Sequence, residues 1–337
     1  MGPKVLFSVE KFLDAAHPEW GGAVHEYGIV GSLASSSMGV VSAFHYDEFL
    51  QTQPDQDVDA ALVKKCEQSK PDMVLATWII QNGERNVKPE TYGHIRDELK
   101  IPVAVYWSES APDVVRHADI FAPHVTVNVF IETKDEWRKH STRPEKCVRL
   151  FEPRNAMLFN STDQEARDIP LSFLGTSFGR LDRALNLGYL RGLGVGVVET
   201  YGQKVNRMGP ADYATMLRRS LVTINFSSAV TFQHITGRVI EAAMAGVMLL
   251  ESENGETPEL LDPYADFIPF REPFHLMSDG QIGVQDGSDL IGKALHYAYQ
   301  KPDEARKVAE SGKRKIIERC DGREFWRKLF EIVEERR

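Results

Sequence analysis

The side chains best suited to chemistry lie close together in the run TGRVIEAAMAGVMLLESENGETPEL, residues 236–260. Glu241 stands there among small and apolar residues, shortly after Gly237 and Arg238 and just before a hydrophobic stretch. The segment RVIEAAMAG predicts a short helix that ends at Gly246, since helices commonly end at a glycine. We therefore expect Glu241 in or near the first turn of this helix.

These residues suit an anionic ligand that carries neighbouring hydroxyl groups. Gly237 lets the backbone come close to a ligand, and the free N–H groups at a helix start bind anions. Arg238 adds a fixed cation, and Glu241 can accept hydrogen bonds from vicinal hydroxyls, as an acid does for a ribose. The set favours a nucleotide-like ligand. The alternative is that Glu241 only complements the helix dipole, with Arg238 as its neighbour on the solvent side.

The elements that position these residues follow from the hydrophobic pattern. Short apolar runs alternate with helical patterns, which predicts parallel βαβ units with both faces of the sheet covered. The predicted strands are 4–9, 39–46, 72–78, 101–107, 120–129, 146–152, 171–176, 194–202, 221–227, 247–252 and 266–270. The predicted helices are 21–36, 57–68, 91–100, 112–118, 133–141, 180–191, 211–219, 238–245, 287–299 and 302–318.

The polar segment 153–170 breaks this alternation and carries a proline at each end, which predicts an interdomain linker. We therefore predict an α/β protein of two Rossmann-like domains, residues 1–155 and 170–318, that face each other across a cleft. In open parallel sheets, ligands collect at the carboxyl ends of the strands, so two substrates could meet there. The amphipathic tail 323–337 is predicted to be a helix that packs back on the first domain.

The composition excludes several classes of protein. The 337 residues are enough for two domains, and 42% hydrophobic with 26% charged residues is typical of a soluble globular enzyme. A net charge of -9 argues against broad nucleic-acid binding. Three widely spaced cysteines without a CxxC motif argue against a disulfide framework or a zinc site and favour a reducing cytoplasm.

Membrane and export signals are not expected either. No run approaches the roughly 20 apolar residues of a membrane helix, and the start MGPKVLFSVEKF lacks the apolar stretch of a signal peptide. Nothing in the sequence supports a peripheral membrane contact. These features also favour a cytoplasmic protein.

Three segments of the second half carry a family resemblance. The run FSSAVTFQHITGRVIEAAMAGVMLLESENGETPELLDPYADFIPF, residues 226–270, resembles the C-terminal signature of GT-B glycosyltransferases, the group-1 and CgeB-like relatives. SFLGTSFGRLDRAL, residues 172–185, resembles the first strand and turn of that domain, and PDEARKVAESGKRKI, residues 302–316, resembles its closing helix. The resemblance spans about half of the chain and implies a GT-B fold.

The resemblance also implies roles for residues of the donor site. The glutamate that matches Glu241 contacts the donor ribose, and arginines that match Arg180 and Arg183 meet the diphosphate. A solvated helix start would explain these two arginines equally well. Many retaining members have a second glutamate eight positions before Glu241, where this chain has Gln233 beside His234. These two residues are therefore expected at the donor sugar.

The first half is similar to the same family at two places. EWGGAVHEYG, residues 19–28, resembles the glycine loop beneath the reaction centre, where Gly21 and Gly22 would let the backbone approach the diphosphate or the acceptor. His25 and Glu26 are candidate acid or base groups there. A histidine on a helix face and a capping glutamate would explain the same pair structurally.

Glu109 is a further candidate base. It lies in YWSESAPD, residues 106–113, at the carboxyl end of a predicted strand, where CgeB-like relatives often carry an acid. An N-cap for the following helix, supplied by Ser110 or Asp113, would explain the motif as well.

No metal cofactor is expected. DQDVD, residues 55–59, contains the Asp-x-Asp pattern that holds a divalent metal in GT-A transferases. Here it follows a proline and opens an amphipathic helix, where acids are routine. Arginines and helix starts would then assist departure of the diphosphate.

Together these observations predict a metal-independent glycosyltransferase that moves a sugar from a nucleotide-diphosphate-sugar donor to a hydroxyl of a glycan, lipid-linked or small-molecule acceptor. The resemblance to retaining families favours retention of the anomeric configuration. If the enzyme inverts, His25, Glu26 or Glu109 must deprotonate the acceptor. The alternatives are a nucleotide-sugar 2-epimerase of the same fold and a non-catalytic protein that binds a sugar or nucleotide.

Overall fold

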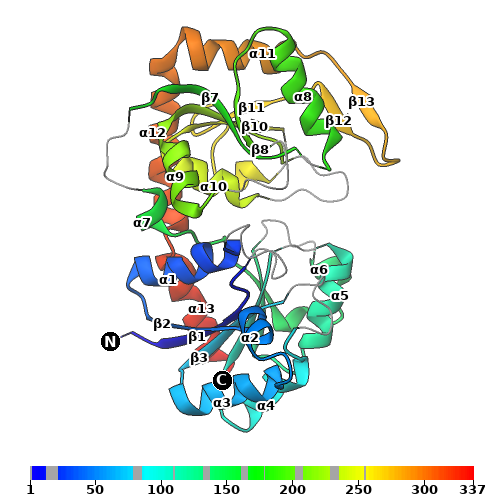
Figure 1. Cartoon of the computed structure of the whole chain (residues 1–337), viewed down its shortest axis with the longest axis vertical. Helices are drawn as coiled ribbons and strands as arrows, with labels where there is room; N and C mark the ends of the chain where they lie inside the picture. Colours follow the sequence, from blue (N-terminus) through cyan, green and yellow to red (C-terminus); the bar gives the residue numbers. More distant parts are fainter. Residues whose placement is uncertain are drawn as a thin grey trace. The chain divides into compact units, whose positions relative to one another are not determined.

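The computed structural model describes residues 2–12, 22–78, 86–108, 111–131, 137–160, 166–177, 179–201, 208–227, 235–253 and 256–337. The chain forms two compact units (Figure 1). The first consists of Met1–Asn155 with Cys320–Arg337, and the second of Ala156–Arg319. No helix in the described ranges combines the length and the apolar character needed to cross a bilayer.

The first unit is built on a parallel sheet whose strand order is β2-β1-β3-β4-β5-β6. Its strands are β1 Lys4–Val9, β2 Val40–His45, β3 Met73–Thr77, β4 Val103–Trp107, β5 Val127–Phe130 and β6 Cys147–Arg149. β1 pairs with β2 on one side and with β3 on the other. The chain therefore reverses its direction of travel across the sheet between β1 and β3, and the helices that follow these strands cover opposite faces.

Helices cover both faces of this sheet. One face holds η2 (Glu26–Val30), α1 (Gly31–Ser36) and α13 (Arg323–Glu335), and the other holds α3 (Val58–Ser69), α4 (Pro89–Asp97) and α5 (Pro112–Phe121). Shorter helices are α2 (Tyr46–Thr52), α6 (Trp137–His140) and η4 (Pro144–Lys146). Since both faces are buried, β3 and β4 are apolar along almost their whole length.

The tail helix α13 is part of the first unit. Trp326 is fully buried and lies edge-on to Phe7 of β1, with ring centroids 5.7 Å apart. Its indole N–H donates to the Ser32 hydroxyl at 3.0 Å. Leu329 and Val333 from the same face join this core. The apolar face that the periodicity predicts is thus the face that packs.

The second unit repeats the plan of the first, with strand order β11-β10-β9-β7-β8. Its parallel strands are β7 Ile169–Thr176, β8 Val198–Tyr201, β9 Ser220–Asn225, β10 Met248–Ser252 and β11 Ile268–Phe270. One face holds α8 (Leu181–Gly192), α11 (Ser288–Leu295), η6 (His296–Gln300) and α12 (Pro302–Cys320). The other holds α7 (Ala156–Phe159), α9 (Pro210–Arg219) and α10 (Gly237–Met244). Here the reversal lies between β7 and β9.

Two predicted segments differ from the structure. Residues 120–129 were expected to be one strand, but α5 runs to Phe121 because Val114, Ala118 and Phe121 form a buried stripe at helical spacing. Residues 153–170 were expected to be a linker. Instead, α7 packs on α9 and α10, with the fully buried Phe159 edge-on to Tyr213 of α9, and the chain joins the second unit from Ala156 on.

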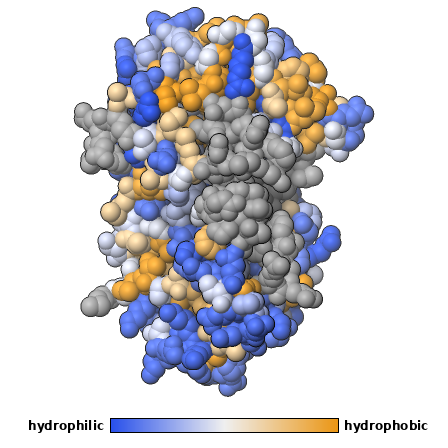
Figure 2. Space-filling view, viewed as in Figure 1, coloured by the Kyte–Doolittle hydropathy of each residue, from blue (hydrophilic) through white to orange (hydrophobic). Residues whose placement is uncertain are grey.

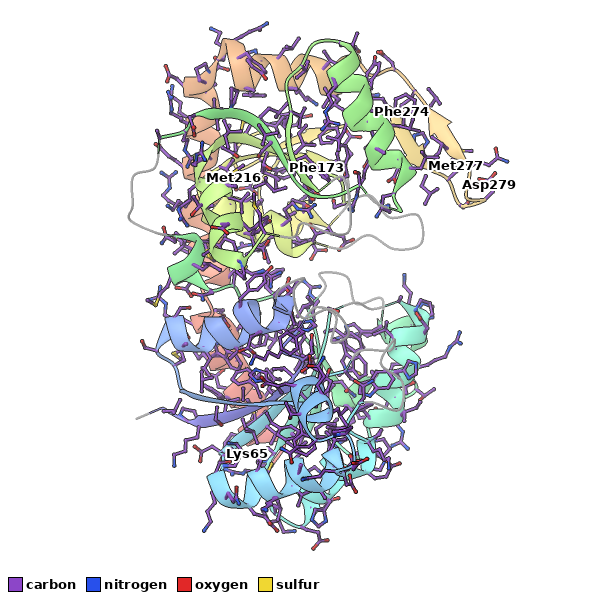
Figure 3. All side chains as sticks on the ribbon, in the orientation of Figure 1. Lys65, Phe173, Met216, Phe274, Met277 and Asp279 are labelled. Atoms are coloured by element: carbon purple, nitrogen blue, oxygen red, sulfur yellow. The ribbon has the colours of Figure 1, made fainter. Side chains whose placement is uncertain are left out.

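The sequence also missed α2 and a small antiparallel hairpin, β12 (Phe274–Leu276) with β13 (Ile282–Val284). Phe274 packs edge-on to Tyr189 of α8, while Met277 and Asp279 lie at the hairpin tip (Figure 3). The hairpin itself carries exposed apolar side chains, among them Leu276 and Val284, and the surface in this region is partly orange in Figure 2. The hairpin therefore joins the second unit mainly through its first strand.

Replacing Trp326 should destabilise the first unit strongly. Trp326→Ala removes a fully buried aromatic side chain and its hydrogen bond, which typically costs about 3–5 kcal/mol of unfolding free energy. Glu331→Ala, on the exposed face of the same helix, should cost less than about 1 kcal/mol. Urea unfolding followed by circular dichroism compares the two, and equal losses would contradict this packing.

Candidate active site

The strand reversal of the second unit gathers polar side chains at the carboxyl ends of β7 and β9. Arg238, from the first turn of α10, donates through Nη1 to Oδ1 of Asn225, the last residue of β9, at 2.7 Å. Its guanidinium carbon also lies 5.6 Å from the ring centroid of Phe173 on β7 (labelled in Figure 3). Open parallel sheets bind ligands at such a reversal.

Gly175 gives Arg238 its place against β7. A Cβ atom at Gly175 would lie 2.5 Å from Nη2 of Arg238, which is closer than real Cβ atoms approach. The guanidinium therefore lies flat against the backbone near the end of β7. Within the described residues, Nε of Arg238 is buried and has no hydrogen-bond partner. Arg238 is thus half-buried and held against β7 and β9, whereas one interpretation of the sequence placed it on the solvent side of Glu241.

Asn225 is itself fixed by a buried carboxylate. Its Nδ2 donates to Glu251 Oε2 at 2.8 Å and to the Thr236 hydroxyl at 2.9 Å, so its Oδ1 faces Arg238. The Ser227 hydroxyl donates to the other oxygen of Glu251. Burial raises the pKa of Glu251 to about 8, although the hydrogen bonds from Ser227 and Asn225 oppose the shift. This network connects β9, β10 and the start of α10.

Two further arginines lie near Arg238. Arg183 donates through Nη2 to the Phe226 carbonyl at 2.8 Å, just beyond β9. Burial, followed by the charges of Arg180 and Arg238, lowers the pKa of Arg183 to about 10. Arg183 is therefore not part of a solvated helix start. Arg180 forms a bidentate pair with Asp182 at 3.1 and 2.8 Å. The concentration of positive charge favours an anionic ligand.

Glu241 lies deeper than the sequence suggests. α10 begins at Gly237, so Glu241 falls in its second turn, on the same face as Gly237. Its residue is only 4% exposed, and its Oε2 accepts a hydrogen bond from the Tyr213 hydroxyl of α9 at 2.9 Å. Its position near the helix start agrees with the sequence, but its burial against Tyr213 depends on α9 packing beside α10. A buried carboxylate does more than complement the helix dipole.

The strand reversal of the first unit also holds a carboxylate. Glu10 follows β1 directly, is 3% exposed, and accepts a hydrogen bond from the hydroxyl of Thr77, the last residue of β3, at 2.6 Å. Its other oxygen contacts Nδ1 of His25. Glu10 and His25 thus lie at the β1–β3 edge of the first sheet, which corresponds to the β7–β9 edge of the second sheet.

A second ion pair lies beside His25. The Tyr106 ring of β4 packs edge-on to the imidazole, with centroids 5.6 Å apart, and its hydroxyl donates to Glu152 at 2.9 Å. Glu152 pairs with Arg154 at 2.6 Å. A Cβ at Gly28 would lie 3.2 Å from Nη1 of Arg154, so this glycine leaves room for the guanidinium. His25 is therefore enclosed by fixed side chains.

Glu26 faces a different partner. Its Oε2 lies 2.9 Å from Nε2 of His45, the last residue of β2. Gly22 forms a bridge with Phe12, and a Cβ there would lie at an ordinary 3.6 Å from the Lys11 carbonyl. The fold itself thus does not require a glycine at position 22.

A family model described as glycosyl transferase-like matches residues 154–331, more than half of the chain. The chain belongs to this family. It is a glycosyltransferase. No curated protein matches its sequence.

Solved structures extend the likeness of this glycosyltransferase to both units. Anabaena Alr3699/HepE in complex with UDP and glucose has a TM-score of 0.63 at 10% identity, covering 99% of this chain and 100% of that chain. Sucrose-phosphate synthase from Thermosynechococcus elongatus has a TM-score of 0.64 at 10% identity, covering 99% of each chain. The catalytic domain of starch synthase IV from Arabidopsis thaliana bound to ADP and acarbose has a TM-score of 0.62 at 9% identity, covering 100% of this chain and 99% of that chain. These structures show the GT-B fold.

Other candidate residues of the glycosyltransferase fall elsewhere. Gly21, Glu109, Gln233 and His234 lie outside the described residues. Two acids of DQDVD, Asp57 and Asp59, have structural partners. Asp57 caps α3 by accepting from the backbone N–H of Asp59, and Asp59 accepts from the Thr91 hydroxyl at 2.6 Å.

Sequence reasoning missed four residues of the glycosyltransferase that the structure places at the strand reversals. They are Glu10, Gly175, Asn225 and Glu251. Glu10, Asn225 and Glu251 are polar residues that end or follow an apolar strand. That position was the available signal, because the carboxyl ends of parallel strands meet at one edge of the sheet.

The buried Glu251 should make the stability of the second unit depend on pH. Its pKa rises from an ordinary 4.5 to about 8 on folding, so between these values the native state keeps a proton that the unfolded chain releases. Stability should therefore fall as pH rises through this window. Glu251→Gln, which keeps the shape without the titration, should remove that loss.

The measurement compares melting temperatures of both proteins at pH 5 and pH 8. The melting temperature of Glu251→Gln should rise relative to that of the wild type as the pH increases from 5 to 8. Asp303→Asn, at a carboxylate that is 85% exposed, is the matched control and should show no such gain. A difference between wild type and Glu251→Gln that stays the same at both pH values would contradict the buried, protonated Glu251.

Proposed function

We propose that this glycosyltransferase takes its sugar from a nucleotide-diphosphate-sugar, binds that donor on the second unit, and needs no metal ion. The observation that carries the proposal is the arginine cluster at the β7–β9 reversal, where Arg183 and Arg238 are fixed by β9. Structural relatives include complexes with UDP, UDP-glucose and ADP, which supports a nucleotide donor here.

Each residue has a distinct part in the proposed donor site. Arg183 and Arg238 face the diphosphate, with Arg180 completing the positive field. The backbone N–H groups at the start of α10, beginning at Gly237, add hydrogen-bond donors for phosphate oxygens. Glu241 accepts from the ribose hydroxyls and shares this task with its present donor, Tyr213. Arginines and N–H groups stabilise the leaving diphosphate without a metal.

The first unit then supplies the acceptor site. Its β1–β3 reversal holds titratable side chains within hydrogen-bond reach of one another, which suits proton transfer from a hydroxyl. Gly22 keeps the donor-side role that the resemblance implies, as do Gly21, Gln233 and His234, which lie outside the described residues. Retention, which the resemblance favours, is one of two stereochemical courses open to a GT-B transferase.

Variants of the donor site should lose nucleotide affinity. Glu241→Gln keeps the side-chain shape but removes a charged acceptor, which typically costs about 1.5–3 kcal/mol. UDP should therefore bind about one to two orders of magnitude more weakly, by calorimetric titration. Arg238→Ala should weaken UDP binding to a similar extent and leave uridine binding nearly unchanged, because its proposed partner is the phosphate.

Asp266→Asn is the matched control for these variants. Asp266 is a buried carboxylate of the same unit, paired with Lys315 at 3.2 Å just before β11. It should lower the melting temperature without changing UDP affinity. Well-folded Glu241→Gln and Arg238→Ala proteins with wild-type affinity for UDP would rule out the proposed donor site.

A panel of nucleotide sugars tests the reaction and its metal requirement together. With a true donor, slow release of nucleoside diphosphate should persist after treatment with a chelator. Loss of release and rescue by manganese or magnesium would contradict the metal-independent mechanism. An isomeric nucleotide sugar would indicate the 2-epimerase instead, and binding without turnover would indicate a non-catalytic protein.

A further inference from the structure

The side chain of Glu10 spans the strand reversal of the first unit. Glu10 follows β1, and its Oε2 accepts from Thr77 at the end of β3 at 2.6 Å. The Tyr46 hydroxyl of α2 donates to the same oxygen at 3.2 Å. Oε1 faces His25. Donors from three different elements therefore fix one carboxylate at the edge where parallel sheets bind ligands.

These donors keep Glu10 ionised. Burial alone would raise its pKa, but the charge of His25 and the hydrogen bonds from His25 and Thr77 outweigh burial and lower it. An ionised carboxylate only accepts hydrogen bonds, so Nδ1 of His25 carries the proton between the two groups. In the neutral imidazole, Nε2 is then the atom with a lone pair.

His25 is held so that Nε2 is available. Nδ1 is bound to Glu10, and the Tyr106 ring packs against the imidazole edge-on. The His25 side chain keeps 17% of its surface exposed, and no hydrogen bond to Nε2 is found among the described residues. The chain continues directly into the π-helical turn η2, a wide turn that is common at functional sites.

The charges that face His25 favour its protonation. Burial alone would lower its pKa, while Glu10 and, more weakly, Glu152 raise it, Arg154 opposes them, and the net shift is upward. A base of raised pKa removes a proton more readily, provided the pH keeps it partly neutral.

The neighbouring Glu26 is a poorer base. Its Oε2 lies 2.9 Å from Nε2 of His45, and its side chain is 33% exposed. Glu48 is a second carboxylate partner of the same histidine. Of the two candidates that the sequence proposes at this turn, the geometry therefore selects His25.

We propose that Glu10 and His25 form a carboxylate–imidazole dyad in which Glu10 is the positioning residue and Nε2 of His25 is the general base for the acceptor hydroxyl. The inference rests on the proposed function. Nε2 takes the proton of the acceptor hydroxyl as its oxygen bonds to the anomeric carbon. The bond from that carbon to the phosphate oxygen breaks, and its electron pair leaves with the nucleoside diphosphate. His25 later releases the proton to water.

This step has a stereochemical consequence. A deprotonated acceptor attacks from the side opposite the leaving group, so the anomeric configuration inverts. The dyad therefore predicts inversion, in contrast to the retention that the sequence resemblance favours. With UDP-glucose, whose glucose is α-linked, and water as the acceptor, the first product would be β-glucose.

The first test needs no substrate. Imidazole NMR of the full chain, with His25 assigned through His25→Gln, should show a proton on Nδ1 and a titration above the ordinary histidine range. Glu10→Gln, which keeps the side-chain shape, should move that titration to lower pH. His45→Gln, which removes the carboxylate–imidazole pair of Glu26 and His45, should leave the His25 titration in place. A His25 that titrates normally and ignores Glu10→Gln would overturn the dyad, whatever the enzyme's donor is.

The second test follows UDP release from UDP-glucose with water as the acceptor. His25→Gln should lower the rate by about 100-fold or more, the range expected for loss of a general base. Glu10→Gln should lower it about 10-fold or more and move the acid limb of the pH profile to lower pH, which a purely structural role would not do. His45→Gln should keep both rate and profile.

The outcomes of the two tests separate the two proposals. Early α-glucose, or an acid limb that Glu10→Gln does not move, would overturn the dyad while leaving the transferase function intact. Absence of UDP release together with an intact NMR titration would count against UDP-glucose as donor and would support the dyad itself.

Discussion

When the first strand of a parallel sheet lies inside the sheet, the connections that leave two neighbouring strands must cover opposite faces. This constraint organises both units. In the first unit the loops after β1 and β3 diverge, and in the second those after β7 and β9 do. The diverging loops leave the strand ends without a covering helix, so polar side chains can gather there. Glu10 occupies this point in one sheet and Arg238 in the other. The fold thus provides two equivalent positions for chemistry.

The position in the second unit carries a cost in stability that its neighbours offset only in part. Glu251 is fully buried and retains its proton near neutral pH, and the half-buried Arg183 has a lowered pKa. Burying a charge is unfavourable unless it is paired and hydrogen-bonded. Asn225 connects these groups by accepting from Arg238 and donating to Glu251. A site that concentrates like charges is stabilised further when an anion binds, which links this cost to the proposed diphosphate.

The sequence predicted the strands of both parallel sheets and most helices, because short apolar runs and apolar residues at a period of 3.6 report burial directly. It could not place Phe121 in α5, since an apolar residue before a strand fits either element. It also could not find the environment of Glu241, which depends on α9 folding beside α10 and bringing Tyr213 within reach. The sequence could not show that Glu10 is held beside His25 for the same reason. The hydrogen bond that fixes Glu10 comes from Thr77, 67 positions further along the chain. Local pattern gives the elements, while side-chain partners depend on tertiary packing.

The β7–β9 reversal of the second unit is expected to bind a nucleoside diphosphate. Hydrogen–deuterium exchange of the full chain tests it most directly, with UDP, ADP and GDP added in turn at saturating concentration. We expect slower exchange in peptides that cover the start of α10 and the start of α8 with at least one of the three nucleotides, and unchanged exchange in α3 and α4. Protection confined to the first unit, or no protection with any of the three, would contradict it.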